Sequence, residues 1–177
     1  MSVKDPTLPT SAVSETIPRW APTSAALSLT SGQLRVAYGA VIPAGATVST
    51  ITIVSGSTAL SVGSNQWFAL FDGSRVKLGV TADDTSTAWA ASTSKTLTLS
   101  AAYTNTTGLD IVGYVGVCVV ATTPPSLNGS LTATAAIADQ VPKLGGQADS
   151  GLTNPASCPA TFTAPASGTG PFYARLA

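Results

Sequence analysis

Short runs of β-branched and aromatic residues, each ended by Gly, Pro, Asn or Asp, place the strongest constraint on how this chain can fold. Side chains of this kind favour strands, and short strands separated by turn residues are typical of two-sheet structures. The sequence therefore predicts an all-β fold, a single β-sandwich or jelly roll. The runs lie at 34–42, 47–54, 66–71, 75–81, 95–100 and 111–121.

One connection between these runs predicts a hairpin. Asp72-Gly73-Ser74 separates 66–71 from 75–81, and an Asp-Gly pair supplies the positive φ angles of a tight turn. The register of 47–54 stays open, because its apolar residues do not share one strict alternation.

The run 111–121 is the longest apolar one, so we expect it to be the central core strand. Gly113 and Gly116 within it indicate close packing or a bulge. Cys118 in the same apolar run is predicted to be a buried free thiol, because two cysteines, Cys118 and Cys158, are too few for a disulfide scaffold and lack the CxxC spacing or His companions of a metal site.

The N-terminal residues have a different character. Prolines among Ser and Thr interrupt 1–31 without a period of strand or helix, which predicts an extended arm that precedes a sandwich domain at 32–177. Large side chains such as Ile17, Trp20 and Leu27 gain from contact with a surface. We therefore expect the arm to dock on its own domain or on a partner.

The C-terminal part is also rich in proline. We expect little regular structure in 122–171, followed by a final strand at 172–176 that returns to pair with a sheet. The segment 131–141 has the most helical character of the chain, but it lacks a convincing amphipathic stripe.

Charge is scarce and balanced. Charged residues make up 9% of the chain, and the formal net charge is zero, against roughly 25% charged residues in typical soluble domains. Such a surface offers little charge repulsion, which favours assembly into homo-oligomers. The basic residues are scattered, so nucleic acid is not an expected partner. Without a long apolar run or an apolar N-terminal stretch, we expect synthesis in a cytoplasm and no membrane insertion.

Catalytic motifs are not evident. The sequence contains no histidine, the commonest general base, so triads and zinc sites are disfavoured. Asp83 and Asp84 would point to opposite faces of a strand, and the spacing of a calcium loop is absent, so a solvated loop is the simpler interpretation. We expect neither an enzyme nor a cofactor or metal. The carboxylates from which a catalytic pair would have to come are Glu15, Asp72, Asp83, Asp84 and Asp110.

Two tryptophans lie outside the strand runs. Trp89 falls in the polar stretch 82–94, where no periodicity explains burial, so it either contacts a ligand together with Asp83 and Asp84 or anchors the loop. Trp20, with Ile17, Pro18 and Arg19, is predicted to anchor the arm on a partner subunit. The aromatic residues predicted to fill the core are Tyr38, Trp67, Phe68, Phe71 and Tyr114.

The motifs from residue 17 onward are Pro18-Arg19-Trp20, Gly32 to Tyr38, Val48 to Gly56, Ala69 to Phe71, Asp84-Thr85, Tyr114 to Val117 and Tyr173 to Leu176. In this order they resemble the minor tail proteins of phages that infect actinobacteria. The resemblance implies a lectin-like sandwich and a place in the virion, where contact with host surface glycans is expected. The sequence departs from that family in a short strand-and-loop region at 66–94.

Three hypotheses remain open at this point. The first is a non-enzymatic structural protein of the phage tail, with the sandwich displayed outward, the arm 1–31 holding it to other virion proteins, and copies arranged symmetrically. The second is a capsid decoration protein or head fibre, for which low charge and an anchoring arm serve equally. The third is a carbohydrate-binding adhesion module, which requires an exposed aromatic platform that includes Trp89.

Overall fold

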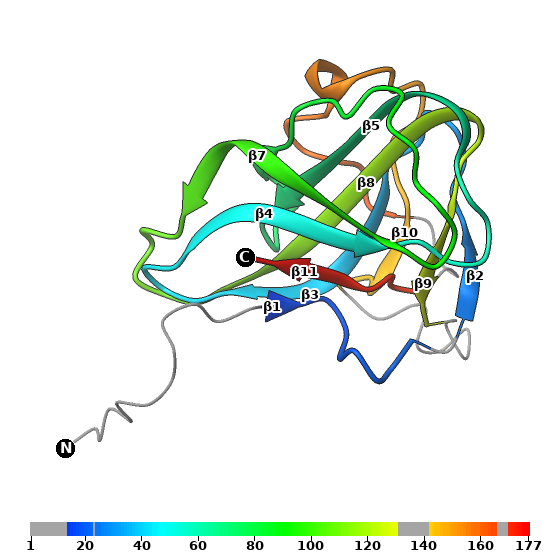
Figure 1. Cartoon of the computed structure of the whole chain (residues 1–177). Coiled ribbons are helices and arrows are strands. Elements are labelled where there is room, and N and C mark those ends of the chain that lie inside the picture. Colours follow the sequence, from blue (N-terminus) through cyan, green and yellow to red (C-terminus); the bar gives the residue numbers. More distant parts are fainter. Residues whose placement is uncertain (1–13, 23, 131–141, 166–169) are drawn as a thin grey trace.

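The described residues of the computed structural model, 14–22, 24–130, 142–165 and 170–177, are arranged mostly in strands (Figure 1). They contain no α-helix, which confirms the all-β prediction. The segment 131–141, considered above for helical character, lies outside the described residues. In chain order the elements are β1 (Ser14–Glu15), β2 (Ser24–Ser28), β3 (Arg35–Ile42), β4 (Thr47–Val54), β5 (Ser61–Phe71), β6 (Lys77–Val80), β7 (Ser94–Thr104), β8 (Ile111–Thr123), β9 (Ser126–Gly129), β10 (Gly145–Gln147), the 3₁₀ helix η1 (Pro155–Ser157) and β11 (Ala174–Leu176).

Two antiparallel sheets pack against each other as a sandwich. One has the strand order β1-β11-β4-β7 and the other β10-β3-β8-β5-β6, while β2 and β9 form a separate pair. Along the chain, β3, β5 and β8 lie in the five-stranded sheet and alternate with β4 and β7 of the four-stranded sheet. Strands that alternate between sheets in this way give a connectivity like that of a jelly roll.

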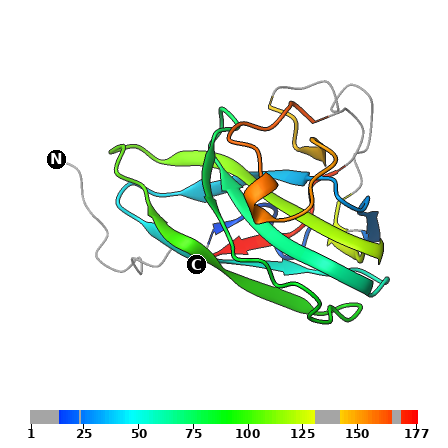
Figure 2. The same ribbon diagram turned by 90° about the horizontal axis from the view of Figure 1, so that it is seen from above.

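The five-stranded sheet is buried on both faces. Its inner face packs on the four-stranded sheet, and its outer face is covered by residues of 148–162 (Figure 2). A sheet covered on both faces is built from continuous apolar runs, which explains the unbroken burial of 66–71 in β5 and of 113–119 in β8. The prediction that 111–121 is the central strand is confirmed, because β8 is the middle strand of this sheet.

Glycine allows this central strand to be approached closely. A Cβ at Gly113 would collide with the carbonyl oxygen of Phe71, and a Cβ at Gly116 would lie 2.9 Å from Cδ1 of Leu34. The predicted close packing is therefore confirmed. The bulge lies on the neighbouring strand, where the register shifts between Tyr38 and Ala40, and the intervening Gly39 has a φ of 116°.

The predicted hairpin joins β5 to β6, but its geometry differs in one respect. Asp72 closes the turn, since its Oδ1 accepts from the backbone N–H of Val76 (2.8 Å) and its carbonyl accepts from Arg75 N–H (3.0 Å). The positive φ, 73°, falls on Arg75 and not on the Asp-Gly pair. Gly73 is needed for space, because a Cβ there would lie 2.8 Å from the carbonyl oxygen of Val112.

The open register of 47–54 is resolved by a bulge in β4. Against β7, the register shift between Val48 and Thr50 reflects extra residues in β7, because these two residues pair with Tyr103 and Thr98. The backbone N–H groups of Ser49 and Thr50 both donate to the carbonyl of Ala177, at 2.7 and 2.8 Å. The extra residue in β4 places Val48 in the same inter-sheet core as Ile51 and Ile53.

The described part of the predicted arm belongs to the sandwich. β1 pairs with β11, and β2 pairs with β9. Thr16, Leu27 and Leu29 are buried, and the Thr16 hydroxyl donates to the carbonyl of Phe172 (2.7 Å). Residues 14–31 therefore contribute strands and core contacts, and in the described residues no boundary at residue 31 separates an arm from a domain. Residues 1–13 lie outside the described residues.

The C-terminal prediction is confirmed. In the described part of 122–171 regular structure is limited to the last residues of β8, to β9, β10 and η1, and β11 then returns to pair with β4. A buried arginine binds the segment of the chain that leads into β11. Arg35 donates from Nη1 to the carbonyl of Ser28 and from Nη2 to the carbonyl of Gly170, both at 3.1 Å, and burial lowers the pKa of its guanidinium to about 10.

Cys118 and Cys158 are buried free thiols in the outer-face cluster, which confirms the prediction for Cys118. Burial raises the pKa of Cys118 to about 12 and that of Cys158 to about 11. Thiols of the unfolded chain ionise near pH 8.5. From about pH 9 to pH 10 the folded state therefore holds more protons than the unfolded state, and stability falls as the pH rises.

We expect this loss to approach about 1.4 kcal/mol per pH unit for each thiol. Urea unfolding of the wild type at pH 7.5, 9 and 10 measures it. Arg35, whose folded-state pKa is about 10, also titrates toward the upper end of this window and acts in the opposite direction, but a variant without the two thiols retains that contribution. The variant with both Cys118→Ala and Cys158→Ala should lose little stability across the same window. An equal slope in that variant would show that other groups cause the effect.

Candidate functional site

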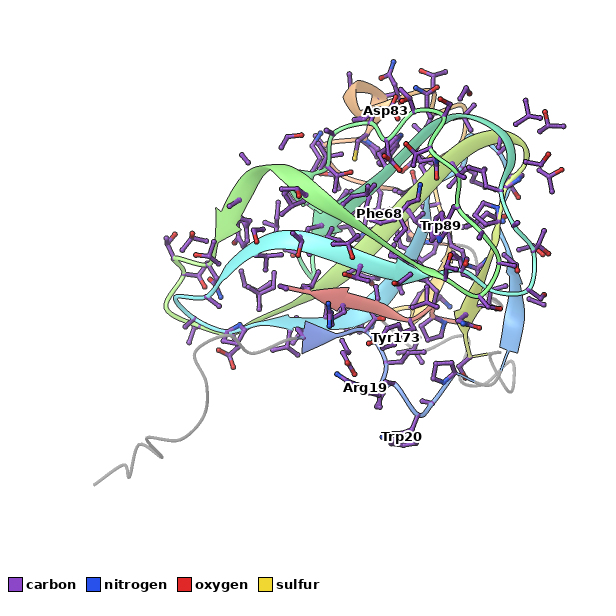
Figure 3. All side chains as sticks on the ribbon, in the orientation of Figure 1. Arg19, Trp20, Phe68, Asp83, Trp89 and Tyr173 are labelled. Atoms are coloured by element: carbon purple, nitrogen blue, oxygen red, sulfur yellow. The ribbon has the colours of Figure 1, made fainter. Side chains whose placement is uncertain are left out.

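A turn that projects between β1 and β2 carries the most exposed large apolar side chain of the described residues. In this Trp20 turn, residues 18–21, the N–H of Ala21 donates to the carbonyl of Pro18 at 2.8 Å. Trp20 lies at the tip with 84% of its surface exposed, and it points away from the sandwich (Figure 3). Pro18 and Arg19 are also exposed, whereas Ile17 is half-buried.

The carboxylate of Glu15 holds the Trp20 turn in place. It accepts from Arg19 at Nε (3.0 Å) and Nη2 (2.6 Å), and from the hydroxyl of Tyr173 (3.0 Å), just before β11. Burial raises the pKa of Glu15, but the bonds from Arg19 and Tyr173 outweigh it and leave the pKa below its usual value. Because Arg19 is largely exposed, the ion pair contributes more to position than to stability.

An open hollow lies beside this turn. The Tyr173 hollow has a volume of about 220 Å³ and is lined by Arg19, Pro22, Val54, Asn128 and Tyr173. Sites for drug-sized ligands usually have about 300–1,000 Å³. The Tyr173 hollow is therefore of a size to receive one large side chain.

The prediction that Trp89 contacts a ligand required this side chain to lie on the surface, and it does not. The indole is 2% exposed and packs at one end of the inter-sheet core, with its ring centroid 5.8 Å from that of Phe68. Its Nε1–H donates to the carbonyl of Thr93 at 3.3 Å. The alternative interpretation, an anchor of the loop 82–94, describes this arrangement.

The two carboxylates of that loop are engaged within the chain, so the prediction that they contact a ligand is not supported. Asp83 accepts from the side chain of Asn65 and from the backbone N–H of Gln66 (2.9 Å). Asp84 pairs with the ammonium of Lys95 at 2.5 Å. Most residues of 82–94 are exposed, as predicted for a solvated loop, but the side chains of Asp83 and Asp84 are partly buried.

Lys95 is the centre of this network. Its Nζ donates to Gln66 Oε1 (2.9 Å), to Asp84 and to the carbonyl of Thr87 (3.2 Å), and it lies 5.6 Å from the ring centroid of Trp89. The network joins β7 of one sheet to β5 of the other and closes the end of the sandwich. Among the described residues, no group of three or more Cys, Asp and Glu side chains could hold a metal ion.

Sequence reasoning missed Glu15 and Tyr173 as partners of the Trp20 turn. They are 158 residues apart, and no local pattern connects them. Lys95 did carry a signal. In the alternating run 95–100, Lys95 shares its parity with Leu97 and Leu99, so it had to point inward with them.

The chain matches none of the known protein families, curated proteins or solved structures with which it was compared. The described residues include no helix with the length and apolar character needed to span a membrane. Fold and site together define an all-β sandwich module with a projecting, well-positioned aromatic turn.

Proposed function

We propose that this chain is a non-enzymatic structural protein of a tailed phage particle, a minor tail protein whose sandwich is displayed outward. The Trp20 turn is its attachment point to other virion proteins, and the copies assemble symmetrically. The order of sequence motifs, the balanced and sparse charge, and the projecting turn all support this proposal.

The observation that carries the proposal is the exposure of Trp20. A tryptophan with 84% of its surface in water is an unusual feature of a monomer, and tryptophan is enriched at the centres of protein interfaces. Glu15 positions the turn before any partner arrives, so little conformational entropy is lost on docking.

The adhesive alternative loses its main support. It required an exposed platform that includes Trp89, and that side chain is buried. Capsid decoration stays an alternative in which the same turn would attach to the head. A cryo-EM reconstruction of the particle tests both: density on the tail supports the proposal, density on the capsid replaces it with decoration, and the absence of the chain from the particle refutes a virion role.

Trp20→Ala should reduce incorporation into particles at least about 30-fold, because loss of an interface tryptophan commonly costs 2 kcal/mol or more. Quantitative mass spectrometry of purified particles measures the copy number. Leu109→Ala is the matched control, since Leu109 is another exposed large apolar residue, at 75%. Equal incorporation of both variants and the wild type would contradict a role for the Trp20 turn in attachment.

A further inference from the structure

The Trp20 turn and the Tyr173 hollow lie next to each other on one face of the molecule. Arg19 and Pro22, which flank Trp20 in sequence, both line the hollow. A projection beside a recess of matching size makes a surface that can be complementary to itself. We propose that two copies of this chain associate about a two-fold axis, each with its Trp20 in the Tyr173 hollow of the other.

The lining of the hollow suits an indole ring. Pro22 and Val54 offer aliphatic surface, and Tyr173 offers an aromatic ring for a tilted or offset contact. The guanidinium of Arg19 stands at the hollow and can lie over the face of the incoming ring. Asn128 provides an amide oxygen that can accept from the indole N–H.

The charge of this face does not oppose a second copy. Among the described residues that line the hollow, Arg19 carries the charge, and Glu15 of the same chain neutralises it. The whole chain has equal numbers of acidic and basic residues. Two identical faces can therefore meet without net repulsion, and a two-fold axis brings the same patch of each copy together.

This inference rests on the proposed function, in which the Trp20 turn is the attachment point and the copies assemble symmetrically, and it names a second copy of the chain as the virion protein bound at that turn. Two Trp20 contacts form in each pair. Each is a single anchor at a small contact, so the association is expected to be weak in solution and favoured where copies are concentrated on a particle.

Sedimentation equilibrium of the purified chain tests the inference. The wild type and Leu109→Ala should form dimers with the same dissociation constant, and Trp20→Ala should weaken dimerisation by about 30-fold or more for each of the two contacts. A wild type that stays monomeric at its highest soluble concentration would overturn the inference. So would an unchanged dimer of Trp20→Ala.

A mixing experiment tests the reciprocal geometry. Val54→Phe fills the hollow but keeps its Trp20, whereas Trp20→Ala keeps its hollow. A mixed pair recovers one of the two contacts, so the mixture should associate about 30-fold more tightly than either variant alone. A mixture no stronger than its components would exclude reciprocal docking. Thermal melts first establish that both variants fold.

The two proposals fail in different ways. If Trp20→Ala is lost from particles while the wild type is monomeric in solution, attachment stands and the second-copy inference is wrong. If Trp20→Ala loses the dimer but enters particles normally, the pairing stands and the role of the turn in attachment is wrong.

Discussion

Replacement of Lys95 by Met should lower the free energy of unfolding by about 2–4 kcal/mol. The substitution removes the cation of a mostly buried ion pair, and the groups that accept hydrogen bonds from its ammonium lose their donor. The Lys95 side chain is 8% exposed, and its ammonium donates to Asp84, to Gln66 and to the carbonyl of Thr87. Asp84 keeps 24% of its side-chain surface in water. Because Asp84 is partly hydrated, the loss of stability should be smaller than the largest losses caused by breaking a fully buried ion pair.

Urea unfolding of three variants measures this effect. Adding Asp84→Asn to Lys95→Met should restore part of the loss, because the uncompensated carboxylate is then gone. Arg19→Met is the matched control, since it also removes the cation of an ion pair, but the Arg19 side chain is 71% exposed. That control should cost less than about 1 kcal/mol. Similar losses in Arg19→Met and Lys95→Met would show that burial of the Lys95 network is not decisive.

The sheets of this protein are predictable where a strand carries its own pattern. The runs that correspond to β3, β4, β8 and the second half of β5 are rich in β-branched or aromatic residues and are ended by turn residues, so local sequence was sufficient there. The first part of β5, 61–65, carries no such pattern and was not predicted. The same runs did not reveal how the strands pair. Because nearly every connection crosses between the sheets, strand order depends on contacts between residues far apart in sequence.

The short strands were not predictable for a related reason. β1, β2, β9 and β10 have between two and five residues each, and their partners lie elsewhere in the chain. Gly145 and Gly146 in β10 have no side chains with which to indicate a strand, and β10 pairs through backbone groups with β3. Pairing with distant strands, rather than the β propensity of their own residues, determines that such segments form strands.

For the two candidate tryptophans, the exposure of the side chain determines whether a contact with a partner or ligand is possible. Trp20 and Trp89 both lie outside the predicted strand runs, yet one is 84% and the other 2% exposed. The difference arises from residues that are distant in sequence, since Trp89 packs on Phe68 and the chain closes around it at Leu60, whose N–H donates to the Trp89 carbonyl. No local pattern contains that information.

Deletion of residues 1–31 should abolish the cooperative fold. It removes β1 and β2, and with them the buried side chains of Leu27 and Leu29. Truncation of one buried leucine to alanine already costs about 2–5 kcal/mol, and whole-domain stability is only about 5–15 kcal/mol. The loss also leaves β9 and β11 without one of their neighbours, and unpaired strand edges promote aggregation.

The point variants Leu27→Ala and Trp20→Ala separate the two roles of this segment. Leu27 is 4% exposed and lies in the inter-sheet core, so its truncation should lower the thermal midpoint by several degrees or more. Trp20→Ala should change stability by less than about 0.5 kcal/mol, as expected for an exposed position. A truncated chain that melts cooperatively near the wild-type temperature would show that 14–31 is a dispensable appendage. If the truncated chain instead fails to fold, the segment is part of the sandwich, and attachment must be tested with Trp20→Ala, which removes the anchor and leaves the domain intact.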